Sequence, residues 1–166
     1  WVSDITYIYT TEDKFCYLHL VTDAFSRMII GYVLSPTLEA KYTIEALQQA
    51  IAYAGGGNLC GTIHHSDRGV QYCCDDYTLL LKAHHIRISM TEDSNPTDNG
   101  LAERVNGIIK NEFLEPLPTP RTLQEAWPLV DHAVRTYNTL RPHINLEMRT
   151  PAQVYEVTNN FQKLEV

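Results

Sequence analysis

Residues 2–34, VSDITYIYTTEDKFCYLHLVTDAFSRMIIGYVL, contain three runs that are rich in β-branched and aromatic side chains. The runs cover residues 2–9, 15–21 and 28–34, and short polar segments separate them. Such side chains favour strands, and strands that follow one another through short turns pair in antiparallel fashion. This stretch therefore predicts a three-stranded antiparallel meander at the start of the chain.

The rest of the chain alternates between helix-like and strand-like patterns. Between residues 39 and 54 apolar side chains recur at helical spacing, and three consecutive glycines follow them, which predicts a helix. The same reasoning predicts strands at residues 61–65 and 86–90, and helices at residues 75–84, 101–112 and 122–140. We therefore expect one α/β domain over residues 1–166, in which a mixed five-stranded sheet, with three antiparallel strands and then two parallel ones, is flanked by helices.

Composition narrows the class of protein. A chain of 166 residues that is 44% hydrophobic and 20% charged has the size and core of one globular domain. No apolar run approaches the roughly 18 residues of a membrane span, and the four cysteines form no CxxC pair or disulfide scaffold. We expect a reduced, cytoplasmic setting without a membrane partner. The net charge of −7, taken alone, argues against a nucleic-acid partner.

Three acidic residues occupy positions of chemical interest. Asp4 lies inside the first predicted strand, where aspartate is disfavoured because its side chain competes for backbone hydrogen bonds. Asp67 follows the strand at residues 61–65, and α/β proteins build their sites at strand ends. Glu103 lies on the helix at residues 101–112. Each acid alone is compatible with an ordinary role at a strand edge, in a turn or on a solvated surface, so none decides the function.

The helix predicted at residues 101–112 has two faces. At 100° per residue its apolar side chains fall within a sector of about 120°, whereas Glu103, Asn106 and Lys110 fall within about 60° on the opposite side. Gly107 borders the polar face at a cost of roughly 1 kcal/mol relative to alanine and leaves room for a closely approaching backbone. One face is thus expected to pack, while the other offers an acid, an amide and a base.

The segment before this helix, TEDSNPTDNG at residues 91–100, contains no large apolar side chain. Its turn-forming residues predict an exposed, mobile loop. Asp98 or Asn99 is expected to cap the start of the following helix.

Longer sequence motifs surround the three acids. They read WVSDITY at residues 1–7, HSDRGVQY at residues 65–72 and NPTDNGLAE at residues 95–103, with 35 residues between the second and third acids. These motifs and this spacing resemble the Asp, Asp-35-Glu signature of the retroviral-integrase-like catalytic core of insertion-sequence transposases. Two further segments, YNTLRPH at residues 137–143 and TPAQVY at residues 150–155, resemble the C-terminal motif of that family. The resemblance extends over about residues 1–156.

The resemblance implies a ribonuclease H-like fold and a DNA transposase or integrase core that cleaves a DNA strand and transfers it to another DNA. It implies two divalent ions, Mg²⁺ or Mn²⁺, held by the catalytic residues Asp4, Asp67 and Glu103. Carboxylate oxygens suit these hard cations, and a pair of them can serve the attacking and leaving oxygens of an in-line displacement. Water would be the nucleophile for cleavage, and a 3′ hydroxyl the nucleophile for transfer. The implied partners are transposon-end and target DNA, and further copies of the chain in an active homo-oligomer.

The resemblance also implies DNA contacts. Asn106 and Lys110 stand where family members carry residues that face substrate DNA, whereas Gly107 stands where a basic residue is common. Weaker candidates for phosphate contacts are Arg68, Arg141 and His143. We expect the N-terminal DNA-binding region of the family to be absent from this chain. Most of the DNA affinity would then lie outside it, which is compatible with the acidic net charge.

Two other functions would use the same residues. A transposase-derived remnant would bind DNA without catalysis, but all three acids are present. A ribonuclease H-like or resolvase-type nuclease would share the metal chemistry, although the segment before Glu103 and the sequence RPH at residues 141–143 favour a transposase. A zinc site made from the paired histidines and cysteines would lack the ligand spacing of structural zinc sites, so we expect those residues to pack.

Overall fold

The structure is a computed structural model that describes residues 1–91 and 99–164, and side chains up to residue 158. Its strands are β1 (Val2–Thr10), β2 (Lys14–Thr22), β3 (Ile29–Ser35), β4 (Ile63–Ser66) and β5 (Arg87–Met90). Its α-helices are α1 (Ala40–Tyr53), α2 (Val70–Cys73), α3 (Asp75–Ala83), α4 (Gly100–Ile108), α5 (Leu123–Thr139) and α6 (Pro151–Leu164). Most of the loop expected at residues 91–100 lies outside the described residues. None of the helices in the described part is long and apolar enough to cross a membrane.

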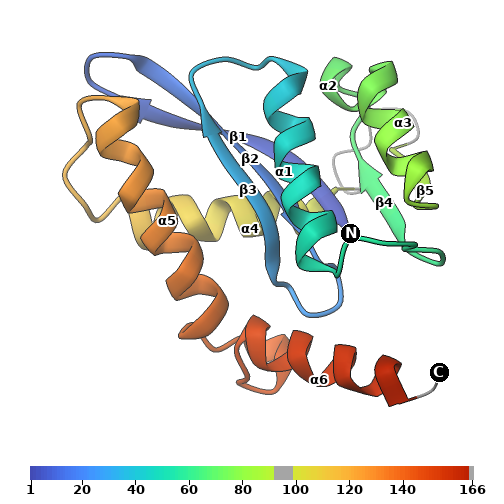
Figure 1. Cartoon of the computed structure of the whole chain (residues 1–166). Coiled ribbons are helices and arrows are strands. Elements are labelled where there is room, and N and C mark those ends of the chain that lie inside the picture. Colours follow the sequence, from blue (N-terminus) through green and yellow to red (C-terminus); the bar gives the residue numbers. More distant parts are fainter. Residues whose placement is uncertain (92–98, 165–166) are drawn as a thin grey trace.

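The five strands form one mixed sheet in the order β3-β2-β1-β4-β5 (Figure 1). The first three strands pair antiparallel, and β4 and β5 join the sheet in parallel pairing next to β1. The predicted architecture is therefore confirmed. Because β1 is the central strand, Asp4 has two strands of the sheet on either side of it, near the start of β1.

Helices pack on both faces of the sheet, because alternate side chains of each strand point to opposite sides. On one face, Leu18 and Leu20 of β2 share a buried cluster with Val105 of α4 and with side chains of α5. On the other face, Val21 and Val33 pack against α1. Figure 1 shows α1 lying across one side of the sheet and α4 on the other. Helix α4, which carries Glu103, is thus fixed to the sheet by its apolar face.

The helix predicted at residues 101–112 changes character part-way. It is α-helical as far as Ile108, and a π-helical segment follows from Ile109 to Leu114. The amide of Glu115 donates to the carbonyl of Lys110 at 2.8 Å, a bond over five residues. Sequence periodicity missed this change because it assumes the α-helical rotation of 100° per residue. A π-helix, whose hydrogen bonds join residues five apart, does not have that rotation. The expected cap is also wrong for Asn99, whose side chain makes no capping bond; Asp98 lies outside the described residues.

Helices α2 and α6 were absent from the sequence prediction. The first is only one turn long, but α6 has a sequence signal in TPAQ at residues 150–153. The Thr150 amide donates to Gln153 Oε1 at 2.9 Å, and the Gln153 amide donates to Thr150 Oγ1 at 3.3 Å. This reciprocal capping box, with proline at the first helical position, starts α6.

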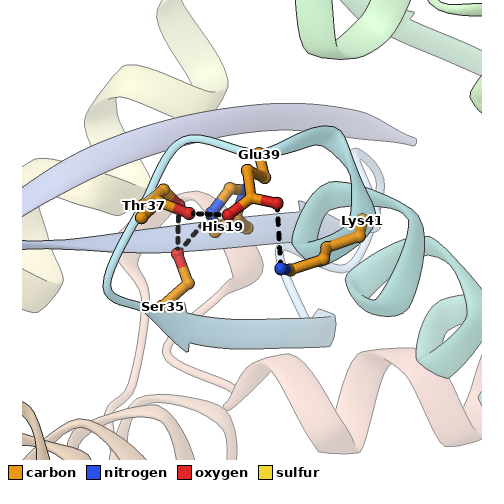
Figure 2. A network of polar contacts seen from close by, with 5 residues as sticks. All are labelled: His19, Ser35, Thr37, Glu39 and Lys41. Atoms are coloured by element: carbon orange, nitrogen blue, oxygen red, sulfur yellow. Dashed lines mark hydrogen bonds and ion pairs between the residues drawn. The ribbon is translucent and has the colours of Figure 1, made fainter.

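A buried histidine ties the end of β3 to the start of α1. His19 Nδ1 lies 2.9 Å from Thr43 Oγ1, and its Nε2 lies 2.9 Å from Ser35 Oγ. The Ser35 hydroxyl donates to the Thr37 carbonyl, so it accepts from the imidazole. Burial lowers the pKa of His19 to about 4, which keeps the ring neutral at pH 7. Figure 2 shows His19 with Ser35 and the continuation of these polar contacts through Thr37 to Glu39 and Lys41.

Side-chain amides occupy the outer edge of β3. Asn138 of α5 accepts from the Ile29 amide at 3.0 Å and donates to the Ile29 carbonyl at 2.8 Å. Gln49 of α1 accepts from the Tyr32 amide at 3.1 Å. Two helices therefore hydrogen-bond to main-chain groups of an edge strand.

Gly31 on β3 permits the close contact between the sheet and α1. A Cβ atom at this position would lie 2.1 Å from the Ala46 carbonyl oxygen. Gly107 differs, because a Cβ there would meet no described atom within 4 Å. The closely approaching backbone expected at Gly107 is therefore not found within the described residues.

These two glycines give a matched pair of substitutions. Gly31→Ala should lower the free energy of unfolding by about 3 kcal/mol or more, because the backbone of α1 must move away from β3. Gly107→Ala should raise it by about 0.5 to 1 kcal/mol, since alanine favours the helix and meets no obstacle. Urea denaturation of both variants measures the changes. Equal unfolding midpoints for Gly31→Ala and the unsubstituted chain would contradict the close contact.

Candidate active site

The parallel pairing of β1 with β4 brings two of the three acids together. Val2 pairs with His65 in this ladder. Asp4 and Asp67 each follow this pair by two residues, and Asp67 directly follows the end of β4. Glu103 lies in the first turn of α4, the helix that packs against β1. The three acids that sequence motifs single out thus come from elements that meet at one end of the central strand.

The carboxylate of Asp4 is half-buried and perturbed. Its pKa is raised to about 6, first by burial and then by the negative charges of Asp67 and Glu103. Hydrogen bonds oppose this rise, and one of them is donated by Asn106 Nδ2 to Asp4 Oδ2 at 2.8 Å. Asp67 and Glu103 each lie near enough to Asp4 to act on its carboxyl electrostatically.

Positive charge does not compensate this cluster. No lysine or arginine among the described residues forms an ion pair with Asp4, Asp67 or Glu103. Asp67 and Glu103 are exposed, and Asp67 Oδ1 accepts from the Gly69 amide at 2.8 Å. Within residues 1–91 and 99–164, no three histidine, cysteine or acidic side chains are arranged as a ready-made metal site. The arrangement is an open acidic cluster with one half-buried member.

Asn106 lies elsewhere than the sequence predicted. It was expected on the exposed polar face of its helix, but only 5% of it is exposed and its amide holds Asp4. Asn99 makes a parallel contact, because its Nδ2 donates to the Ser3 carbonyl at 3.0 Å. The side-chain oxygens of both asparagines are buried without a partner among the described residues. Two amides therefore anchor α4 to β1 on either side of Glu103.

A neutral histidine supports the strands beneath the acids. His64 Nε2 of β4 lies 2.8 Å from Ser3 Oγ of β1 and 2.8 Å from Tyr77 Oη of α3. Burial lowers the pKa of His64 to about 3, so the ring stays uncharged at pH 7. His64 thus links the two strands that carry Asp4 and Asp67 without adding charge.

The predicted DNA contacts are distributed around α4. Lys110 is half-buried on the π-helical segment and lines a cavity with Tyr7 and Leu129. Arg68 follows Asp67 and donates from Nε to the Thr91 carbonyl at 2.9 Å. Neither cation contacts the acids directly through an ion pair.

Arg141 and His143 lie with other basic residues beside α4. Arg141 forms two hydrogen bonds with the carboxylate of Glu112, at 2.6 and 2.7 Å. Both residues line a cavity together with Arg27 and Arg104, to which the sequence analysis gave no role. Helical spacing gave no signal for Arg104, because it lies about 40° outside the apolar sector of the helix, where an exposed charged residue is ordinary.

The family of the chain follows from comparison with known proteins. A model of the integrase core domain family matches residues 1–96, and a second model with the same description matches residues 84–151. The chain belongs to the integrase core domain family. The fold is accordingly the ribonuclease H-like fold of integrase cores.

Relatives of this integrase core include bacterial transposases. It is 40% identical over 114 residues to the transposase InsF for insertion sequence IS3A of Escherichia coli K12, covering 69% of this chain and 38% of that protein. It is 36% identical over 114 residues to the transposase for insertion sequence element IS629 of Shigella sonnei, covering 69% and 37%. The chain therefore spans less than half the length of these two transposases.

Solved structures of integrases share the fold. The catalytic core domain of HTLV-2 integrase, solved in complex with magnesium in a trimeric form, is 26% identical with a TM-score of 0.70. The match covers 92% of this chain and 93% of that one. The match therefore extends over most of that catalytic core domain.

The perturbed carboxyl of Asp4 makes stability depend on pH. Its raised pKa means that the folded domain keeps a proton which the unfolded chain has lost, so the contribution of Asp4 to stability should fall as the pH rises from about 4 to about 6. The lowered pKa values of His19 and His64 contribute a rise over the same range, so the effect of Asp4 is the difference between the profiles of the variant and the unsubstituted chain. The loss in metal-free solution is about 3 kcal/mol. Asp4→Asn should remove this fall and unfold at higher temperature at pH 7, because Asn keeps an oxygen that can accept from Asn106.

Thermal melts between pH 4 and 8 with a chelator measure this effect. Asp76→Asn, which removes an exposed carboxylate on α3, is the control and should keep the fall. Parallel pH profiles for Asp4→Asn and the unsubstituted chain would show that Asp4 is not destabilising.

Proposed function

We propose that this chain is the catalytic core of an insertion-sequence transposase, a polynucleotidyl transferase that cleaves DNA strands and joins them to target DNA. The observation that carries the proposal is the uncompensated cluster of Asp4, Asp67 and Glu103, which interact electrostatically at one end of β1 in an integrase core. Relatives named as transposases support the biological context.

The donor set of this cluster fits hard divalent cations. The charges of Asp67 and Glu103 disfavour ionisation of Asp4, and none of the three acids has a lysine or arginine partner among the described residues. A bound cation would offset that repulsion. We infer that Asp4, Asp67 and Glu103 hold two Mg²⁺ or Mn²⁺ ions as the catalytic residues. Bound cations of this kind activate the attacking oxygen and stabilise the leaving oxygen of an in-line displacement. The HTLV-2 core is a relative that was solved with magnesium.

The remaining residues of the site have supporting roles in this proposal. Asn106 donates to Asp4 Oδ2 and favours its ionised, oriented form. The exposed carboxylates of Asp67 and Glu103 are open to a large substrate such as DNA. Lys110 and Arg68 are proposed to contact backbone phosphates near the acids, whereas Asn106 acts through Asp4 rather than on DNA. Water serves as nucleophile for cleavage and a DNA 3′ hydroxyl for joining.

Assembly with other molecules is part of the same proposal. The substrates are transposon-end and target DNA, and several copies of the chain act together as a homo-oligomer. The chain carries a net charge of −7, so affinity for plain duplex DNA should be weak.

A strand-joining assay with a pre-nicked DNA end and Mn²⁺ tests the reaction class. Cleavage without joining would assign the site to a nuclease of the ribonuclease H or resolvase type instead.

Substitution of Asp67 tests the role of the acids. Asp67→Asn should abolish cleavage and joining, to below about 1% of the original rate, because the amide keeps the shape of the side chain but binds the cation poorly. The domain should stay folded, since Asp67 is exposed. Asp76→Asn is the matched control and should retain activity.

Melting temperature with and without Mn²⁺ gives a readout independent of activity. A cation at roughly ten times its Kd adds about 1.4 kcal/mol to the stability of the folded state, a shift of about 3 to 6 °C for a domain of this size. The shift should shrink in Asp67→Asn and persist in Asp76→Asn. An equal Mn²⁺ shift in both variants would exclude Asp67 as a metal ligand.

A further inference from the structure

A basic cavity lies on the side of α4 that faces the end of α5. Its volume is about 350 Å³, and its basic lining residues are Arg27, Arg104, Arg141 and His143. We call it the arginine cavity. Arg27 comes from the turn between β2 and β3, Arg104 from α4, and the other two from the segment after α5. Residues remote in sequence thus converge on one concave site, a common property of ligand sites.

Hydrogen bonds and ring contacts fix the walls of the arginine cavity. Arg27 has a φ of 67°, a left-handed conformation that is rare for residues other than glycine. Its carbonyl accepts from Tyr137 Oη at 3.0 Å. The Tyr137 ring packs edge-on against His143, with ring centres 5.0 Å apart. The strained turn, α5 and the following segment are therefore held together by one buried tyrosine.

The charges in the cavity are incompletely neutralised. Arg141 is paired with Glu112, but neither Arg27 nor Arg104 forms an ion pair with a described residue. The positive charges of Arg141, Arg27 and Arg104 all lower the pKa of His143, after the larger effect of its burial. Three guanidinium groups therefore lie near enough to act on the imidazole of His143, and among the described residues only Arg141 of the three has a carboxylate partner. This is a local cationic site in a chain of net charge −7.

Guanidinium groups match the geometry of phosphate oxygens, and two unpaired ones in a concave site favour a phosphate ligand. The cavity also lies next to the acidic cluster, because α4 contributes residues to both. Arg104 directly follows Glu103 on α4, and the same helix presents Asn106 to Asp4. Phosphates recur about every 3.4 Å of axis along one DNA strand, so a strand at Glu103 carries other phosphates past the first turn of α4.

We propose that the arginine cavity binds a backbone phosphate of the DNA strand next to the phosphate that is attacked at the acids. This proposal rests on the proposed function of the chain. Arg104 and Arg27 contact the phosphate oxygens, while Arg141, oriented by Glu112, adds positive charge from the wall. The cavity thereby sets the path of the DNA over α4 in a chain whose net charge is −7.

The proposal can be tested without catalysis by measuring how tightly the folded chain binds a short DNA duplex. Fluorescence anisotropy in the presence of a chelator measures this affinity. Arg104→Gln and Arg27→Asn should each weaken binding by about 3- to 10-fold, and the double variant should lower the salt slope by about 0.9, the loss of one phosphate contact. Asparagine tolerates the left-handed backbone at position 27. Arg87→Gln is the matched control, since Arg87 is exposed on β5 at the opposite edge of the sheet. Its effect should stay below about 2-fold.

Equal affinities for the cavity variants and Arg87→Gln would overturn the proposal, provided that their melting curves match that of the original chain. Arg104 is exposed, so its substitution should leave the fold intact even if that of Arg27 does not. Inorganic phosphate is the second probe, followed through the amide NMR signals of residues 104, 141 and 143. These signals should respond to DNA at much lower concentration than to phosphate. An equal response to both would assign the cavity to a free anion and overturn its role in binding DNA.

The strand-joining assay separates this proposal from the proposed function. Loss of DNA binding in Arg104→Gln together with full joining activity in Asp67→Asn would support the cavity and refute the catalytic acids. Loss of joining in Asp67→Asn with unchanged DNA binding in Arg104→Gln would refute only the cavity.

Discussion

The parallel pairing of β1 with β4 determines the positions, along the two strands, of two acids that are distant in the sequence. A shift of one residue would turn Asp4 to the other face of the sheet, because side chains alternate along a strand. The register is held by more than the ladder: His64 bonds to Ser3 and Tyr77, and Asn99 bonds to the Ser3 carbonyl. These contacts all converge on the residue before Asp4. The geometry of the acidic cluster therefore depends on the packing of three elements around one short stretch of β1.

The same packing explains why the site is electrostatically unfavourable in isolation. Asp4 is half-buried in the central strand, near two other carboxylates, and it forms no ion pair with a lysine or arginine in the described part of the chain. The protein places its positive charge on the other side of α4 instead, where Arg27, Arg104 and Arg141 gather. One helix thus separates an acidic site suited to metal ions from a basic site suited to phosphate. Such a division suits a substrate that is itself a polyanion and reacts through bound cations.

The sequence was sufficient to predict the sheet, because β-branched runs, short turns and the helical spacing of residues 39–54 are local signals. It also singled out the three acids through motif and spacing, and their role stays a prediction. What it could not supply were features set by tertiary contact. Asn106 has the spacing of a surface residue, yet it is buried because α4 lies against Asp4. The π-helical segment and the convergence of Arg27 with Arg104 likewise depend on packing between remote elements, whereas α6 was missed despite its capping box.

The amides that border β3 have a consequence for behaviour at high concentration. An edge strand with free main-chain groups is a template for pairing with a strand of another molecule. Here Asn138 occupies both groups of Ile29, and Gln49 occupies the amide of Tyr32. A foreign strand would have to displace both amides before it could extend the sheet at this edge. Through these two side chains, helices α5 and α1 protect the domain against sheet-to-sheet polymerisation on this side.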